Sequence, residues 1–334
     1  MLPSFAYVRA GSLDEAVKLL ESGEACLHAG GSDLLGCLRD GVFTTGTVVS
    51  LAGIGSLRGV AETAQGELSL GALTTLAEVA AHPGLRERWT ALPEAASQVG
   101  SPQLRCQGTL GGNLCQKPRC WYYRGDFRCL RKGGELCYAL AGENEYHAIA
   151  GGGPCYVVHP SDTAPALMAL GALVQVVGPA GSRTLPLEKL FVLPSQDVRR
   201  ETALEPGEIL TRVVLPRPAP GLRSTYRKVR ARASFDFALV GAALALQLEG
   251  GHVRRARVVL SGVAPVPWPA PAVERALAGQ RLDRDTIARA AEAATLKMEP
   301  LEKNAYKLPL LRGLVRERLE ALAGRGAGAR ADTA

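Results

Sequence analysis

The sequence predicts an α+β protein with two or three domains, and three observations support this class. The chain has 334 residues, of which 47% are hydrophobic, so it can bury more than one core. Helical and strand-like patterns follow one another along the chain, and neither dominates. The proline-rich segment PRPAPG, at 216–221, separates two such series and is typical of a semi-rigid linker.

The first 55 residues predict a small β-α-β unit, which we expect to be the first domain segment (1–55). Ser12 and Glu15 form a capping box before a helix at 13–20. Apolar strands are expected at 25–28 and 48–51. Between them the turn AGGSDL leads into a short helix, with Ser32 expected as its N-cap.

Residues 56–217 predict a larger α+β segment, and residues 222–324 predict another. The expected strands of the first are at 57–63, 66–73, 172–178 and 208–216, and its expected helices are at 75–82, 89–99 and 162–170. Pro83 should end the first of these helices and Pro93 should interrupt the second. The C-terminal segment has expected strands at 224–231, 237–249 and 254–263, followed by helices at 273–279, 284–298 and 309–324. The tail 325–334 is expected to be disordered.

Two glycine turns have the composition of a diphosphate site. The first, AGGSDL, covers 29–34, and the second, GTLGGN, covers 108–113. Consecutive glycines let backbone N–H groups approach a ligand closely. Neither turn is G-x-G-x-x-G or a Walker sequence, and the first could equally be a simple strand-to-helix connection. Two such turns in different subdomains could hold a dinucleotide in the crevice between them.

Half of the eight cysteines lie in one glycine-rich stretch, at Cys120, Cys129, Cys137 and Cys155. Their spacing, C-x8-C-x7-C-x17-C, lacks the C-x2-C pair of common zinc fingers, whereas thiolates at irregular spacing suit an iron–sulfur cube. The pattern therefore favours iron–sulfur over zinc. Cys106 and Cys115 lie close enough to be reserve ligands, and Cys26 and Cys37 have the surroundings of core thiols.

Charge and hydropathy exclude several other classes. The net charge is +7, but the arginines are scattered, only 5% of the residues are aromatic and no nucleic-acid motif occurs, so we expect no nucleic-acid partner. No apolar run is long enough to cross a bilayer, and the N-terminus does not have the pattern of a signal peptide. We therefore expect no membrane contact and a cytoplasmic location. Export on a partner's signal, which would give a periplasmic location, stays open.

Four phrases together resemble one family. AGGSDL, GTLGGNLC, HPSD (159–162) and KVRARASFDFA (228–238) resemble the FAD-binding subunits of the molybdenum hydroxylases, which include xanthine dehydrogenase, aldehyde oxidoreductase and carbon monoxide dehydrogenase. The resemblance runs from about residue 3 to about residue 323. It implies a two-subdomain FAD-binding domain of the vanillyl-alcohol-oxidase (PCMH) type, followed by the family's α+β C-terminal domain.

The resemblance also implies which residues contact FAD. Those of the first turn are Ala29, Gly30, Gly31, Ser32, Asp33 and Leu34, and those of the second are Thr109, Gly111, Gly112 and Asn113. Asp162 matches an acidic residue beside the ribityl chain, and Lys228 matches a lysine near the nucleotide. Some relatives carry Asn in place of Gly31 and Ser in place of Thr109. By composition alone, Asp162 could simply cap its helix and Lys228 could be a surface charge.

A subset of the family carries an insertion that holds a 4Fe–4S cluster, and the segment 115–155 resembles it. The subset includes flavin subunits of 4-hydroxybenzoyl-CoA reductase and of certain bacterial aldehyde oxidases. The phrases RCWYYR (119–124) and GPCY (153–156) match the ends of the insertion. The implied ligands are Cys120, Cys129, Cys137 and Cys155. Whether such a cluster carries electrons or only orders the loop stays open.

The implied function is electron transfer. A large partner subunit with a molybdopterin cofactor would oxidise the substrate, an aldehyde or an aromatic heterocycle. A small partner with two 2Fe–2S clusters would pass the electrons on to FAD in this subunit, for delivery to an external acceptor. No catalytic acid or base is required, and none is assigned. The alternative is a zinc-stabilised nucleic-acid or regulatory binding protein.

Overall fold

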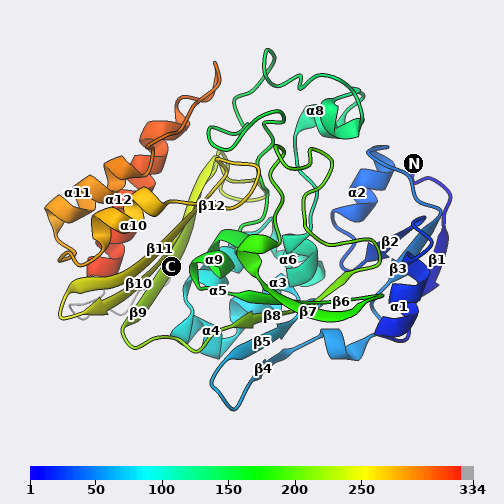
Figure 1. Ribbon diagram of the computed structural model, residues 1–334, viewed down its shortest axis with the longest axis horizontal. Helices are drawn as coiled ribbons and strands as arrows, with labels where there is room; N and C mark the ends of the chain where they lie inside the picture. The colour runs from blue at the N-terminus through cyan, green and yellow to red at the C-terminus, as the bar shows by residue number, and fades with distance from the viewer. Residues whose placement is uncertain (325–334) are drawn as a thin grey trace.

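The computed structural model describes residues 1–324 and arranges their strands in three sheets (Figure 1). The tail that we expected to be disordered lies outside the described residues. The first sheet is parallel, with the order β1-β3-β2. Its elements are β1 (Ala6–Arg9), α1 (Leu13–Leu20), β2 (Ala25–His28), α2 (Leu34–Arg39) and β3 (Thr47–Ser50). They form the small unit expected near the N-terminus, with the apolar side chains of α1 packed against the sheet.

The second sheet is antiparallel, with the order β4-β5-β8-β6-β7. Its strands are β4 (Val60–Glu62), β5 (Leu68–Gly71), β6 (Leu173–Gly178), β7 (Gly181–Pro186) and β8 (Ile209–Leu215). The chain leaves this sheet after β5 and returns to it only at β6. The helices of this segment and the cysteine-rich loop (115–155) therefore form one long excursion from a single sheet.

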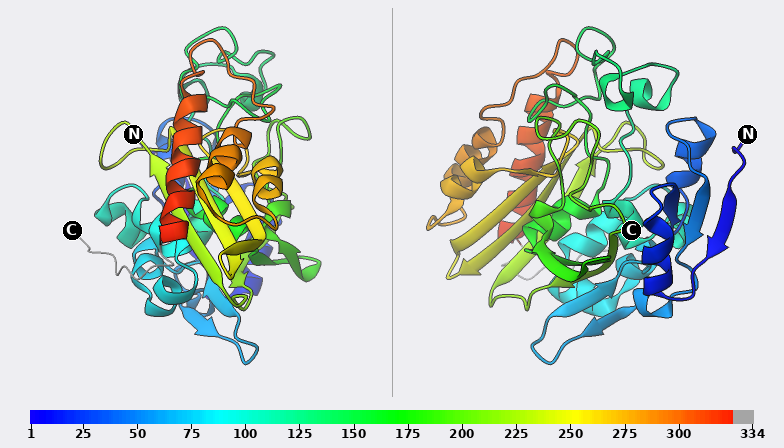
Figure 2. Two further views of the ribbon diagram at one scale, coloured as in Figure 1. Left: turned by 90° about the vertical axis from the view of Figure 1, so that its left-hand side faces the viewer. Right: turned by 45° about the vertical axis from the view of Figure 1, so that its right-hand side comes forward.

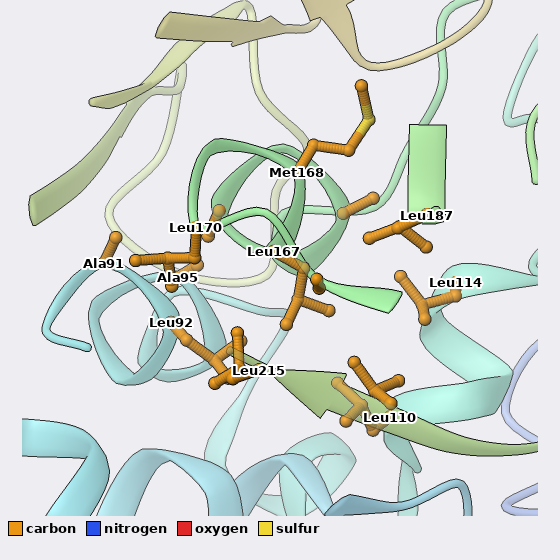
Figure 3. Packing of buried hydrophobic residues seen from close by; sticks show 14 of the residues in the cluster. Ala91, Leu92, Ala95, Leu110, Leu114, Leu167, Met168, Leu170, Leu187 and Leu215 are labelled. Carbon is orange, nitrogen blue, oxygen red and sulfur yellow. The ribbon is translucent and has the colours of Figure 1, made fainter. Parts of the chain in front are cut away.

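Short helices pack against the second sheet. They are α3 (Leu76–Ala81), α4 (Pro83–Arg88), α5 (Ala91–Ser97), α7 (Leu110–Leu114) and α9 (Thr163–Ala169). Helix α6 (Pro102–Gln107) buries no residue and lies beside α3. Figure 3 shows Leu92 of α5, Leu110 of α7 and Leu167 of α9 in one buried cluster with Leu215 of β8. Each fully buried leucine stabilises the fold by about 2 kcal/mol. This cluster holds the second glycine turn, which α7 contains, against the sheet.

The third sheet is antiparallel, with the order β12-β11-β10-β9. Its strands are β9 (Leu222–Val229), β10 (Val240–Glu249), β11 (His252–Ser261) and β12 (Trp268–Pro269). The helices α10 (Pro271–Leu277), α11 (Arg284–Ala293) and α12 (Lys307–Gly324) cover one of its faces, and Figure 2 shows α12 lying across the strands. Within residues 1–324, no helix has the length and apolar character needed to cross a membrane.

Both faces of the third sheet are buried, and β10 shows how. Ala243 and Ala245 belong to the core shared with α5 and α9, while Leu244 and Leu246 belong to the core under α10–α12. Successive side chains of a strand point to opposite faces, so a strand buried on both sides is apolar throughout. This explains the continuous run VGAALAL, and it fixes the C-terminal domain rigidly to the middle one.

The cysteine-rich loop lies at the top of Figure 1 and is held from two sides. It contains one short helix, α8 (Trp121–Arg124), and one 3-10 turn, η2 (Leu130–Lys132). On the C-terminal side, Asn304 Nδ2 donates to the carbonyl oxygens of Asn144 and His147, at 3.2 and 3.1 Å. Lys307 Nζ donates to three carbonyl oxygens, those of Tyr146, His147 and Gly262, at 2.7–3.0 Å.

Two expectations about local structure are wrong, and the one for Pro83 is confirmed but incomplete. Pro83 does not only end α3; it also occupies the first position of α4, where proline fits because that N–H has no partner in a helix. Pro93 lies in the first turn of α5 and does not interrupt it. Ser32 is not the N-cap of α2: that position is Asp33, whose side chain makes no capping bond. Strands β1, β7 and β12 were not expected from the sequence.

Candidate functional site

A cleft of about 570 Å³ opens between the N-terminal unit and the middle domain, a size suited to a small-molecule ligand. All twelve residues proposed for FAD contacts line it: Ala29, Gly30, Gly31, Ser32, Asp33, Leu34, Thr109, Gly111, Gly112, Asn113, Asp162 and Lys228. The structure thus brings together residues from four separate parts of the chain. That these residues contact FAD stays a prediction.

The two glycine turns touch each other at the cleft, and this contact requires glycine. A Cβ atom on Gly30 would lie 2.2 Å from the carbonyl oxygen of Gln107 and 3.2 Å from Cα of Gly108. Gln107 Nε2 also donates to the Gly30 carbonyl at 3.2 Å. Gly31 has a φ of +73°, a conformation that L side chains rarely adopt. The close packing places the backbone of both turns on the wall of one cleft.

The second turn is the start of a helix and is anchored to the HPSD phrase. Thr109 caps α7 by accepting from the N–H of Gly112 at 3.2 Å. Asn113 Oδ1 accepts from the hydroxyls of Ser161 and Thr163, at 2.6 and 2.7 Å. These buried bonds explain why the two phrases occur together, because the asparagine positions the segment that carries Asp162.

Asp162 and Lys228 form a buried ion pair at the wall of the cleft. Their side chains are 5% and 1% exposed, and Lys228 Nζ lies 2.6 Å from Asp162 Oδ2. Tyr226 Oη donates to the other carboxylate oxygen at 2.6 Å. Burial, together with the Asp162 charge, raises the pKa of Tyr226 well above its ordinary value. Asp162 is not a side-chain cap of α9 and Lys228 is not a surface charge, so both simpler interpretations are wrong.

Asp33 faces the cysteine-rich loop. Its carboxylate accepts from the N–H of Lys117 and from Arg124 Nη2, each at 2.7 Å, and forms an ion pair with Arg119 Nη2 at 3.0 Å. Glu201, from the chain between η3 (Leu187–Lys189) and β8, pairs with Lys117 and with Arg131. Asp33 thus ties basic side chains of the loop to the N-terminal unit, and Glu201 ties others to the middle domain.

Sequence reasoning missed several residues that line the cleft. Lys117 and Arg119 come from the cysteine-rich loop, and Phe235 and Phe237 come from the bend between β9 and β10. Phe235 is 61% exposed and has a φ of +55°, an uncommon conformation for a bulky residue. The phrase SFDF was noticed for its family resemblance, but no pattern indicated that its rings reach the cleft. His159, the first residue of the HPSD phrase, is not among the residues that line the cleft, and its ring packs edge-on against Phe191.

The four predicted cysteine ligands line one small cavity beneath the loop: Cys120, Cys129, Cys137 and Cys155. Burial raises the pKa of the Cys120 thiol to about 11. A hydrogen bond from Cys155 lowers the pKa of Cys137 to about 6. No other cysteine of the described residues is among those lining this cavity. Cys115 lines the cleft, and Cys106 is exposed, which argues against both reserve ligands.

His147 also lines the cysteine cavity and was not predicted. Its Nε2 lies 3.2 Å from Cys120 Sγ, and its ring stands edge-on to Trp121 at 5.5 Å between centroids. Burial lowers the pKa of His147 to about 4, so the imidazole is neutral. The only signal in the sequence that could have indicated His147 as a residue of this cavity is its position within the cysteine-rich loop.

Two features of the cysteine cavity limit which metal group it can hold in this conformation. Its volume is about 10 Å³, the space of one water molecule. In residues 1–324, no three histidine, cysteine or acidic side chains converge on a position for a single metal ion. The donor chemistry fits an iron–sulfur cluster, but the cavity would have to expand to enclose one.

Comparison with known proteins decides the family. The family described as the FAD binding domain in molybdopterin dehydrogenase matches residues 3–218, and the CO dehydrogenase flavoprotein C-terminal domain matches residues 224–322. The chain is an FAD-binding subunit of the molybdenum hydroxylase family. It is therefore a subunit of an oxidoreductase, which decides against the alternative of a zinc-stabilised binding protein.

Individual relatives are similar to this chain over almost its whole length. The aldehyde oxidoreductase FAD-binding subunit PaoB of Escherichia coli K12 is 35% identical over 315 residues, covering 92% of this chain and 95% of that one. The carbon monoxide dehydrogenase medium chain of Afipia carboxidovorans is 30% identical over 302 residues, 88% of each chain. Among solved structures, carbon monoxide dehydrogenase from Hydrogenophaga pseudoflava, in a form without the Mo-pyranopterin moiety of its cofactor, superposes with a TM-score of 0.77. It is 27% identical and covers 97% of this chain and 99% of its own.

Proposed function

We propose that this subunit holds FAD in the cleft and a 4Fe–4S cluster in the cysteine-rich loop, and that it transfers electrons within a molybdenum hydroxylase. The observation that carries the FAD site is the gathering of all twelve resemblance-derived residues around one cleft. Their placement is consistent with the two-subdomain vanillyl-alcohol-oxidase-type arrangement expected from the sequence. FAD, when bound, supplies the exchange between one- and two-electron transfer.

The protein's own part in this function is to bind and orient. The glycines of the two turns, which line the cleft and carry no side chain, would let the diphosphate approach the backbone there. Lys228 and Asp162 hold opposite charges at the wall, where they can meet polar groups of the ribityl chain and nucleotide. Phe235 and Phe237 offer exposed rings that suit a planar ligand. No residue need donate or accept a proton.

The Gly112→Val substitution tests the FAD site. A side chain here would project at a lining position of the cleft, with its Cβ 2.9 Å from Thr109 Oγ1. We expect the variant to lose FAD, whereas the purified parent protein should release noncovalent FAD on acid treatment. The matched control is Gly313→Val, at a helical glycine with no atom within 4 Å of the added Cβ. Full FAD occupancy in folded Gly112→Val, verified by circular dichroism, would refute the two-turn site.

The cluster proposal rests on the four cysteines that line one cavity. In a cube each iron takes one cysteine, so the thiolates need to surround a volume and need not converge on one point. A tetrahedral zinc site requires all four ligands around a single ion. The proposal of a cube therefore rests on the four thiols that line one cavity and on the resemblance of the loop to the cluster-bearing insertion.

Iron and acid-labile sulfide analysis tests the cluster. Anaerobically purified protein should contain about four of each per chain. The Cys129→Ser variant should lose both, while Cys106→Ser, at an exposed cysteine outside the cavity, should keep them. Zinc as the sole metal would contradict the proposal. Loss of the cluster in Cys115→Ser with retention in Cys120→Ser would show that the ligand assignment is wrong.

The partners are proposed from the relatives. Their names describe a subunit of aldehyde oxidoreductase and medium chains of carbon monoxide dehydrogenases. We propose that this chain likewise assembles with a large molybdopterin-binding subunit, which would oxidise an aldehyde or an aromatic heterocycle, and a small subunit with two 2Fe–2S clusters. The resemblance of the loop to that of bacterial aldehyde oxidases supports an aldehyde as the substrate.

A further inference from the structure

Arg119 belongs to the cysteine-rich loop but lines the cleft of the FAD-binding domain. It immediately precedes the proposed cluster ligand Cys120. Its guanidinium lies over the ring of Phe237, with Cζ 5.0 Å from the ring centroid, and its Nη2 lies 3.0 Å from Asp33 Oδ1. The group therefore stands between the first glycine turn and the aromatic bend that carries Phe235.

The charges around Arg119 do not balance. Asp33 is the one carboxylate within ion-pair distance of Arg119 and of Arg124 among the residues described, so one carboxylate serves two guanidinium groups. Arg124 is also satisfied by the carbonyl oxygens of Pro118 and Lys117, at 2.9 and 3.2 Å. Arg119 has fewer partners. Its Nη2 donates to Gln116 Oε1 at 3.1 Å as well as pairing with Asp33, its Nε is buried without a hydrogen bond, and its Nη1 makes no hydrogen bond within the described residues. One cation with an unused donor thus remains at the wall of the cleft.

We infer that Arg119 is a further FAD-binding residue and that its guanidinium contacts the diphosphate of the dinucleotide. Guanidinium groups bind phosphate oxygens through paired N–H donors. Arg119 is held beside Asp33, the residue that follows Ser32 in the proposed diphosphate turn. The inference rests on the proposed placement of FAD in this cleft. It adds a contact supplied by the inserted loop, outside the two glycine turns.

This contact would make FAD affinity depend on the order of the cysteine-rich loop. Arg119 is fixed by the same segment, 117–124, that Asp33 clamps. A disturbed loop would withdraw the guanidinium from the cleft while leaving both glycine turns in place. The two proposed cofactor sites would then be coupled in binding as well as adjacent in sequence.

The inference is tested by measuring the dissociation constants of FAD, ADP and riboflavin for the flavin-free protein. The parent is compared with three variants, Arg119→Met, Arg119→Lys and Arg128→Met. Arg128 is an exposed arginine of the same loop that does not line the cleft. Arg119→Met should weaken the binding of FAD and of ADP by about ten-fold, the loss typical of one charge-assisted hydrogen bond. Its affinity for riboflavin should equal that of the parent. The FAD affinity of Arg119→Lys should lie between those of Arg119→Met and the parent, and the FAD affinity of Arg128→Met should equal that of the parent.

The outcomes separate this inference from the FAD site itself. Equal FAD affinity in Arg119→Met and the parent, with FAD lost in Gly112→Val, would overturn the role of Arg119 alone. Equal weakening of FAD and riboflavin would also overturn it, because riboflavin has no phosphate. Undiminished FAD binding in Gly112→Val would overturn the placement of FAD in the cleft.

Discussion

Lys228 and Asp162 illustrate how a single pair of side chains links the domains. Lys228 lies on β9 of the C-terminal sheet, whereas Asp162 precedes α9 of the middle domain. A surface ion pair is worth little, but removing one partner of a buried pair leaves an uncompensated charge away from water. The pair therefore constrains the cleft wall more strongly than its position in the sequence suggests.

The Lys228→Met variant should be destabilised by about 3–5 kcal/mol, because it leaves the Asp162 carboxylate buried and unpaired. Urea unfolding of the FAD-free protein measures this. The control is the double variant Lys228→Met with Asp162→Asn, which removes both charges and should recover a large part of the loss. If single and double variants unfold at the same urea concentration, charge compensation does not account for the role of the pair.

At the residue scale, the sequence indicated which residues gather at the cleft but not what their side chains do there. The glycine turns are local motifs, and their requirement for glycine follows from the backbone alone. Asp33, by contrast, was placed in the flavin turn by resemblance, yet its carboxylate is engaged by Lys117, Arg119 and Arg124. Those partners lie more than 80 residues away, and no spacing rule connects them.

At the scale of elements, the cysteine-rich loop is organised by the C-terminal domain. Asn304, just before α12, and Lys307, its first residue, donate to backbone carbonyls of the loop that have no sheet or helix partner. Lys307 is fully buried, and its three acceptors match the three N–H donors of an ammonium group. A loop with so few apolar side chains thus gains order from polar contacts with a neighbouring domain.

The Lys307→Met variant should loosen the segment 143–150, because the Tyr146 carbonyl loses its donor, the His147 carbonyl keeps only Asn304, and the tie to the Gly262 carbonyl is lost. Hydrogen–deuterium exchange of peptides from this segment should increase by at least ten-fold. Lys303→Met is the matched control: Lys303 pairs with Glu143 on the surface, where both side chains are largely exposed, so little should change. Equal exchange in the two variants would show that Lys307 does not hold the loop.

At the scale of elements, the sequence predicted helices and strands correctly where a local signal was strong. It failed where tertiary contacts determine the local structure. The helix at 13–20 and the strand at 25–28 have the predicted bounds, because capping and apolar runs are local signals. The short helix α7 was interpreted as a turn because it contains two glycines, which disfavour helices in isolation. It forms because Thr109 caps it and because Leu110 and Leu114 are fully buried.

At the scale of the whole molecule, the three sheets and the loop surround two adjacent sites. The cleft lies between the N-terminal and middle domains. The cysteine cavity is lined by residues from along the cysteine-rich loop, which the C-terminal domain helps to hold. The linker and the apolar runs predict a division into segments, and the bounds of those segments stay a prediction. The sequence did not predict that the C-terminal sheet shares a core with α5 and α9, since that contact depends on which face of β10 each residue occupies.

This arrangement has a consequence for activity. The described residues offer a cleft suited to FAD and a cavity lined by cysteines, and among them we assign no group to substrate oxidation. The isolated chain, loaded with FAD, should therefore show no steady aldehyde oxidation with an artificial electron acceptor. Co-expression with a molybdopterin-binding large subunit and a 2Fe–2S small subunit should give a stable heteromer that does. The comparison requires FAD content to be equal in both preparations, so that a missing flavin does not mimic a missing partner. Steady turnover by the isolated chain would place substrate oxidation in this subunit and contradict the proposed division of labour.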